Sequence, residues 1–201
     1  MEKIVKKLAS AITEPLGYDS EQQAVVQYGL FAIIQIIIIG IIITVFGLVT
    51  NCLLECWISY LAVAILRKST GGAHAKTSNE CLIISVAVIS VIGIISHYLK
   101  LIPYGQVIGL ALCPLLFIIS CFIVYKKAPV DSEKKPIKSP KKIRRLRIIS
   151  FITLIAYAII SIAFIAVSFK FEAGLYLAVS LNLSVFWQSI TLLLAVKQTV
   201  E

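Results

Sequence analysis

A chain of 201 residues that is 59% hydrophobic has too little interior to bury its apolar side chains as a water-soluble domain. We therefore expect lipid to surround most of it. The formal net charge of +9 does not indicate nucleic-acid binding, because ten of the 19 basic residues lie between positions 126 and 147. A charge excess confined to one inter-helix loop instead indicates membrane topology and contact with anionic membrane lipids.

The first twenty residues are too polar for a secretory signal, and the apolar run after them is too long to be the core of one. We expect residues 1–20 to form an amphipathic segment, helical up to Pro15, that lies in the plane of the membrane surface. A frayed polar terminus is the alternative. The apolar face of this helix would contain Ile4, Val5, Leu8 and Ile12.

Six later stretches approach the roughly 20 apolar residues that a helix needs to cross a bilayer core. They run from Val25 to Val49, Cys52 to Leu66, Cys81 to Tyr98, Val107 to Tyr125, Ile148 to Phe169 and Ala173 to Val196. The second is short and contains Glu55, so it is tilted, begins in the headgroup zone or packs inside the bundle.

Continuous apolar runs without alternating polar residues exclude a transmembrane β-barrel. We predict an all-α fold: a polytopic membrane helical bundle of about six transmembrane helices plus the amino-terminal amphipathic helix. Residues 1–201 would form a single membrane domain.

Basic residues collect before the first span, between the second and third spans, in the loop 126–147 and near the carboxyl terminus. With six spans these regions share one side, which the positive-inside rule makes cytoplasmic. Both termini and the segments 67–80 and 126–147 would then face the cytoplasm. Within the basic loop, Pro129, Pro136 and Pro140 predict a linker rather than a continuous helix.

The polar segment 67–80 contains a histidine, His74, and Cys81 follows it where the next apolar stretch begins. Thr77 and Glu80 match the capping-box pattern, so Thr77 (or Ser78) would cap a helix with Cys81 in its first turn. A helix amino terminus favours an anion, which would stabilise a thiolate. The pattern therefore predicts a candidate cysteine nucleophile with a histidine base.

A straight helix from His74 to Cys81 would separate their α-carbons by roughly 10 Å, too far for an easy direct hydrogen bond. The segment must bend, and Gly71 and Gly72 supply backbone freedom just before it. When the residues alone are considered, the competing interpretation is that one histidine and one cysteine are close in the sequence by chance.

The string from Arg67 through Gly-Gly-x-His-Ala to a cysteine seven residues after the histidine resembles the AgrB family of membrane endopeptidases. The length, the flanking apolar runs and the basic loop are also similar. The resemblance implies that Cys81 is the nucleophile and His74 the base. It also places Arg67 and Gly72 at positions needed for processing. From the residues themselves, we expect Gly71 and Lys76 to support the site. We expect Arg67 or Lys76 to bind a precursor carboxylate, although contact with a lipid phosphate explains Lys76 equally well.

The implied activity is cysteine endopeptidase cleavage of a short quorum-sensing precursor, an AgrD-like peptide, followed by closure of the product to a thiolactone. The location implied is a bacterial cell membrane. No cofactor or metal is implied. The oligomeric state stays open, and a homodimer is compatible with a small bundle that encloses a peptide.

Other polar residues within the apolar stretches give weaker signals. Cys52 and Cys56 are one helical turn apart and could share a metal, but packing is favoured because no histidine lies near on that side. Glu55 is most simply a helix-end carboxylate at the outer headgroups, and His97 a structural residue at the same interface. Five polar residues are candidates for hydrogen bonds between helices: Ser161, Ser180, Asn182, Ser184 and Gln188.

Two rival functions are also compatible with the sequence. A non-enzymatic membrane transporter or docking protein would keep its activity without the Cys81 thiol. A membrane acyltransferase could use the same cysteine and histidine on lipid chains, and its product would gain the mass of an acyl group.

Overall fold

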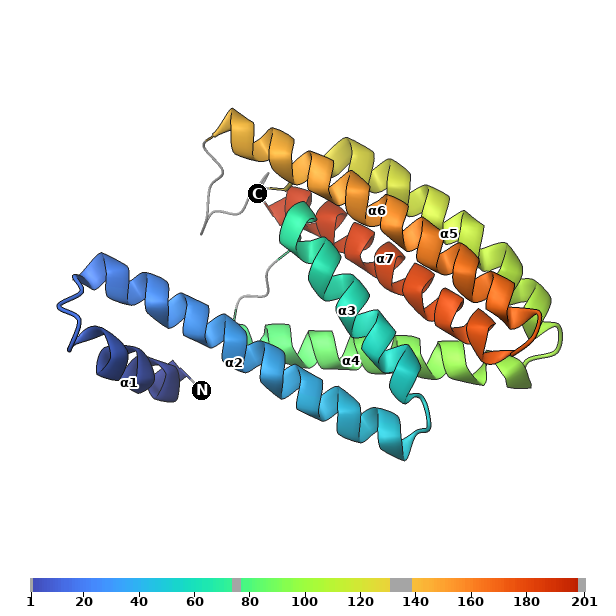
Figure 1. Ribbon diagram of the computed structural model, residues 1–201, viewed down its shortest axis with the longest axis horizontal. Helices are drawn as coiled ribbons and strands as arrows, with labels where there is room; N and C mark the ends of the chain where they lie inside the picture. Colours follow the sequence, from blue (N-terminus) through green and yellow to red (C-terminus); the bar gives the residue numbers. More distant parts are fainter. Residues whose placement is uncertain (1, 74–76, 131–138, 199–201) are drawn as a thin grey trace. The chain divides into compact units, whose positions relative to one another are not determined.

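The computed structural model describes residues 2–73, 77–130 and 139–198, and every regular element within them is a helix (Figure 1). The predicted all-α fold is therefore confirmed. The chain divides into two compact units, the first ending at Ile42 and the second starting at Ile43.

The first unit contains α1 (Glu2–Thr13) and most of α2 (Ser20–Val49). As predicted, α1 ends before Pro15. Its most buried residues follow a four-residue spacing along one face: Val5, Ala9 and Thr13. The Gln23 amide of α2 donates a 2.9 Å hydrogen bond to the Ser10 hydroxyl of α1, which links the two helices.

The second unit contains five α-helices and one 3₁₀ turn among its described residues: α3 (Leu53–Thr70), α4 (Ser78–Tyr98), η1 (Leu99–Leu101), α5 (Gly105–Lys127), α6 (Pro140–Ser168) and α7 (Ala173–Gln198). The central helix is α7, which packs against α3, α4, α5 and α6 (Figure 1). In its most apolar stretch 61% of the residues are buried, compared with 22% in α5 and in α6. The polar residues of α7 therefore lie where they can reach several neighbouring helices.

Within the part of the chain that the structure describes, five helices are long and apolar enough to cross a membrane: α2, α4, α5, α6 and α7. Helix α3, which forms from the short second stretch, is not one of them. It buries Glu55, Ser59, Ser69 and Thr70 inside the unit, which matches the expected option of a helix packed within the bundle. The chain is a multi-pass membrane protein, and a full crossing by α3 stays a prediction.

The basic linker is shorter than the sequence analysis predicted. Helix α6 begins at Pro140 with Ser139 as its N-cap, so the basic residues from Lys141 to Arg147 are helical. Proline is compatible with the first helical position because its missing N–H would have no partner there. At the other side, α5 extends to Lys127. Residues 131–138, with the remaining lysines of this segment, lie outside the described residues.

Hydrogen bonds between helices hold the second unit together, as predicted for several polar residues. The Asn182 amide of α7 donates to the Ser161 hydroxyl of α6 at 2.7 Å, and Ser180 of α7 donates to the backbone oxygen of Glu55 at 2.7 Å. Ser184 instead donates to the backbone of its own helix. Such bonds stabilise helix packing where lipid cannot supply partners.

Candidate functional site

Cys81 lies in the first turn and a half of α4, close to the predicted position. Thr77 is the N-cap: its hydroxyl accepts from the Glu80 amide at 3.2 Å, and the Glu80 carboxylate accepts from the Thr77 amide at 3.3 Å. The predicted capping box is therefore confirmed. The Cys81 amide donates to the Thr77 carbonyl at 3.2 Å, and the residue is partly exposed. This arrangement fixes the backbone that carries the thiol, in a residue that stays partly exposed.

The segment that leads towards Cys81 begins with two glycines in conformations that other residues rarely adopt. Helix α3 ends at Thr70, and Gly71 has φ +74° while its amide donates to the Arg67 carbonyl at 3.0 Å. Gly72 has φ +149°. A side chain at either position would strain the backbone. We call residues 70–73 the glycine strap.

The glycine strap is attached to the carboxyl-terminal part of α7. The Gln188 amide nitrogen donates to the Gly71 carbonyl at 2.7 Å and to the Thr70 hydroxyl at 3.1 Å. The Ala73 amide donates to the Thr191 carbonyl at 2.9 Å. Close approach makes glycine necessary here, since a β-carbon at Gly72 would lie 2.7 Å from the Thr191 hydroxyl oxygen.

Sequence reasoning missed this use of α7. Gln188 was expected to bond between helices but was not connected with the segment containing His74, and Thr191 was not singled out. The only available signal was a pair of polar residues three positions apart on one face of an apolar helix.

Two further contacts hold the strap from other sides. The Arg67 guanidinium donates to the Ala73 carbonyl. The Val130 amide, after α5, donates to the Thr70 carbonyl at 2.9 Å. In this structure Arg67 therefore braces the strap. Its contact with a precursor carboxylate stays a prediction.

His74 and Lys76 lie outside the described residues. The structure describes the chain up to Ala73 and again from Thr77, so both flanks of His74 are defined. The pairing of His74 with Cys81 and the contact of Lys76 with a carboxylate or a phosphate stay predictions.

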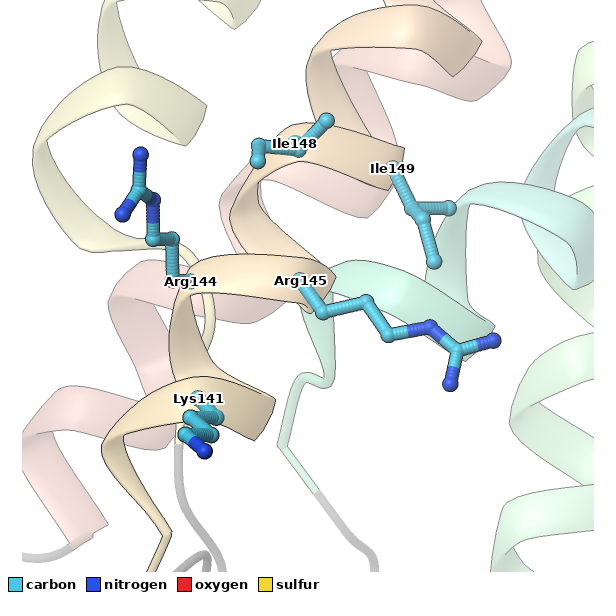
Figure 2. Close-up of a pocket in the computed structure, with 5 residues that line it drawn as sticks. All are labelled: Lys141, Arg144, Arg145, Ile148 and Ile149. Atoms are coloured by element: carbon cyan, nitrogen blue, oxygen red, sulfur yellow. The ribbon is translucent and has the colours of Figure 1, made fainter.

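A cationic patch occupies the first turns of α6. Lys141, Arg144 and Arg145 line an open hollow of about 520 Å³ together with Ile148 and Ile149. Figure 2 shows the two guanidinium groups extending to different sides of the helix, with the isoleucines one turn further along. Cationic groups followed within one turn by exposed apolar side chains suit a membrane interface.

A second polar cluster lies at the opposite end of α3 from the glycine strap. The Glu55 residue is 6% exposed, and its carboxylate lies 2.8 Å from Nδ1 of His97, while the Lys100 ammonium lies 3.1 Å from Nε2. Since Lys100 can only donate, Nε2 accepts and Nδ1–H donates to Glu55. Glu55 lies in the first turn of α3, as expected for a helix-end carboxylate, but His97 of α4 shields and pairs it. Its location at the outer headgroups stays a prediction.

Cys52 and Cys56 belong to the packing at the same end of α3. Both thiols are fully buried and lie 3.6 Å apart. A β-carbon at Gly93 of α4 would lie 2.5 Å from the Cys56 sulfur, so the two helices approach closely here. Among the residues that the structure describes, no group of three or more His, Cys, Asp or Glu side chains could hold a metal ion.

Five apolar helices of spanning length, together with a partly exposed cysteine at a capped helix start, define a multi-pass helical membrane protein with a candidate thiol site. The family model described as "Accessory gene regulator B" matches residues 1–192. The chain therefore belongs to the AgrB family, and the resemblance in the sequence is confirmed.

Curated relatives agree with this assignment. The chain is 34% identical to "Putative AgrB-like protein 2" of Clostridium perfringens (strain 13 / Type A), with 96% of this chain and 91% of that protein covered. It is also 34% identical, with the same coverage, to "Putative AgrB-like protein" of Clostridium perfringens (strain SM101 / Type A). A match to "Accessory gene regulator protein B" of Staphylococcus intermedius is 32% identical over 54% of each chain. No solved structure matches the chain.

Proposed function

We propose that this protein is a membrane cysteine endopeptidase that cuts a short AgrD-like quorum-sensing precursor and closes the product to a thiolactone. Membership of the AgrB family supports a precursor of this kind as the class of substrate. The observation that carries the proposal is the position of Cys81: a partly exposed thiol at a capped helix start, directly after the segment that contains His74. A helix amino terminus stabilises a thiolate, which is the reactive form of cysteine.

The reaction begins with His74 taking the proton of the Cys81 thiol. The thiolate attacks the carbonyl carbon of one peptide bond in the precursor. The C–N bond breaks, His74 protonates the departing amine, and the amino-terminal part of the precursor remains on Cys81 as a thioester. The carboxy-terminal fragment is released.

In the second step a cysteine thiol within the bound peptide attacks that thioester. A new S–C bond closes the thiolactone, and Cys81 is regenerated with the proton of the attacking thiol. No water is consumed, so the products together have the mass of the precursor. One thioester replaces another at nearly equal free energy, and the site must therefore restrict water to prevent hydrolysis.

The same proposal places the segment 67–80 and both termini on the cytoplasmic side of a bacterial cell membrane, by the positive-inside rule. Anionic lipid would contact the cationic patch of α6, where arginines stand beside exposed isoleucines. A cytoplasmic site suits a precursor synthesised in that compartment.

The test uses the full chain, reconstituted in vesicles with or without anionic phospholipid, and a synthetic precursor that contains one internal cysteine. Mass spectrometry should detect a product one water lighter than the linear amino-terminal fragment, with faster formation in the anionic vesicles. Cys81→Ala and His74→Ala should abolish it. Cys121→Ala is the matched control, because Cys121 is the other partly exposed cysteine, and it should stay active.

The outcomes separate the rival functions. Processing by Cys81→Ala would exclude the cysteine mechanism. A product carrying added acyl mass would indicate an acyltransferase. Intact precursor on the other side of the vesicle membrane would indicate a transporter.

A further inference from the structure

The Gln188 side chain is fully buried in α7, yet it is polar and faces a helix end. Its amide nitrogen carries two hydrogens and has two acceptors, the Gly71 carbonyl and the Thr70 hydroxyl. The Thr70 hydroxyl in turn lies 2.9 Å from the Leu66 carbonyl, to which it donates. Both amide hydrogens of Gln188 are thus engaged where α3 ends and the glycine strap begins.

The orientation of this amide follows from its partners. Turning the amide over would place Oε1 against the Gly71 carbonyl oxygen, and two acceptors repel each other. In the observed orientation Oε1 is buried without a hydrogen-bond partner among the described residues. Leucine would fill similar space in this apolar helix without burying an unpaired acceptor. Packing alone therefore does not account for a glutamine at this position.

The strap requires restraint from outside because its own sequence supplies little. Two consecutive glycines have the widest choice of backbone conformations of any dipeptide. Their observed φ angles, +74° and +149°, persist through contacts with α7, Arg67 and Val130. The bonds to Thr191 and from Val130 are made by backbone atoms, and the Thr70 hydroxyl near the Gly71 carbonyl belongs to the strap itself. Among the described residues outside the strap, the side chains of Arg67 and Gln188 donate to the strap carbonyls.

We propose that Gln188 is a positioning residue for precursor processing: it fixes the Gly71 carbonyl and thereby the path of the chain that continues into His74. This inference rests on the proposed function, in which His74 transfers the protons. Gln188 does not contact the reacting atoms. Losing its two donors should therefore slow the proton-transfer steps more than it weakens precursor binding.

The test compares Gln188→Leu with Asn182→Leu in the reconstituted full-length protein. Asn182 is a matched control, because it is a buried amide of α7 that bonds to Ser161 of α6 and not to the strap. We expect Gln188→Leu to lower kcat by tenfold to a hundredfold, on the order of the loss that a misplaced catalytic group produces, with KM changed less than about twofold. Asn182→Leu should keep kcat within about threefold of the wild type, although its melting temperature should be similar to that of Gln188→Leu.

A second measurement separates positioning from general loosening. A precursor with a thioester at the scissile bond has a thiol leaving group, which departs without protonation. The defect of Gln188→Leu should shrink several-fold on this substrate, whereas a folding defect would lower both rates equally. Gln188→Glu keeps the shape but faces the Gly71 carbonyl with an acceptor, so it should also be impaired.

The results distinguish a failure of the proposed function from a failure of the role assigned to Gln188. If the wild type forms no thiolactone, the proposed function fails and the role of Gln188 fails with it. If the wild type is active but Gln188→Leu and Asn182→Leu lose kcat equally, or Gln188→Glu is fully active, only the Gln188 assignment is overturned.

Discussion

The contact between Gly72 and Thr191 permits a quantitative test of how the strap docks on α7. In Gly72→Ala the added β-carbon would lie 2.7 Å from the Thr191 hydroxyl oxygen and 3.3 Å from the Gln188 amide nitrogen. The backbone also carries a φ of +149°, which alanine rarely adopts. Each of the two effects, overpacking and backbone strain, costs about 1–3 kcal/mol. The docked strap should therefore lose roughly 2–6 kcal/mol, which corresponds to a processing rate at least about 30-fold lower.

The steric part of this cost can be removed separately. In Gly72→Ala/Thr191→Ala the hydroxyl is absent, and the next nearest atom of residue 191, its β-carbon, lies at 3.5 Å, an ordinary contact. The backbone strain and the tight approach to Gln188 remain. We expect the second substitution to restore about 1–2 kcal/mol, a gain of roughly 5-fold to 30-fold in processing rate over Gly72→Ala alone.

Gly71→Ala supplies the control for this cycle. A β-carbon at Gly71 would lie 2.6 Å from the Val130 backbone oxygen, which no side-chain substitution can remove. Thr191→Ala should therefore not improve Gly71→Ala. The assay is the initial rate of thiolactone formation for the four single and double variants. Full activity in Gly72→Ala, or an equal effect of Thr191→Ala on both glycine variants, would refute the docked strap as the active conformation.

Two other substitutions test the capping box and the buried hydrogen bond between Glu55 and His97. Thr77→Ala removes the N-cap of α4, which should cost about 1 kcal/mol and lower the processing rate through disorder around Cys81. The rate of hydrogen exchange at the first amides of α4 should rise. An unchanged exchange rate would contradict this prediction. His97→Ala leaves the buried Glu55 carboxylate without its nearest hydrogen-bond donor, so the free energy of unfolding should fall by roughly 1–3 kcal/mol. Because Glu55 lies at the far end of α3 from the strap, the processing rate per folded molecule should stay unchanged. Loss of processing in a fully folded His97→Ala variant would instead place Glu55 in the mechanism.

Much of the fold could be predicted from hydropathy, because lipid requires long helices with internal backbone hydrogen bonds. The amphipathic first helix, the spanning helices and the Thr77 cap all follow from local patterns. The start of α6 was misplaced, because Pro140 was interpreted as a helix breaker although it occupies the first helical position.

The candidate site could be predicted only where its residues are close together in the sequence. Thr77, Glu80 and Cys81 interact within one helical turn, so their spacing carried the information. Gln188 lies 117 residues from Gly71, and its contact depends on how α7 packs against α3. Burial of Glu55 beside His97 likewise depends on tertiary packing, which periodicity does not specify.

The residues that carry the family resemblance have unequal tasks in this structure. Arg67 from α3 and Gln188 from α7 hold carbonyls two residues apart, at Ala73 and Gly71, and Gly72 between them has no room for a side chain. Docking of the strap therefore gives an arginine and a glycine at this spacing before a histidine a structural task. On this interpretation the motif has two parts: Arg67, Gly71 and Gly72 fix the backbone, and the chemistry is left to the histidine and the cysteine that follow.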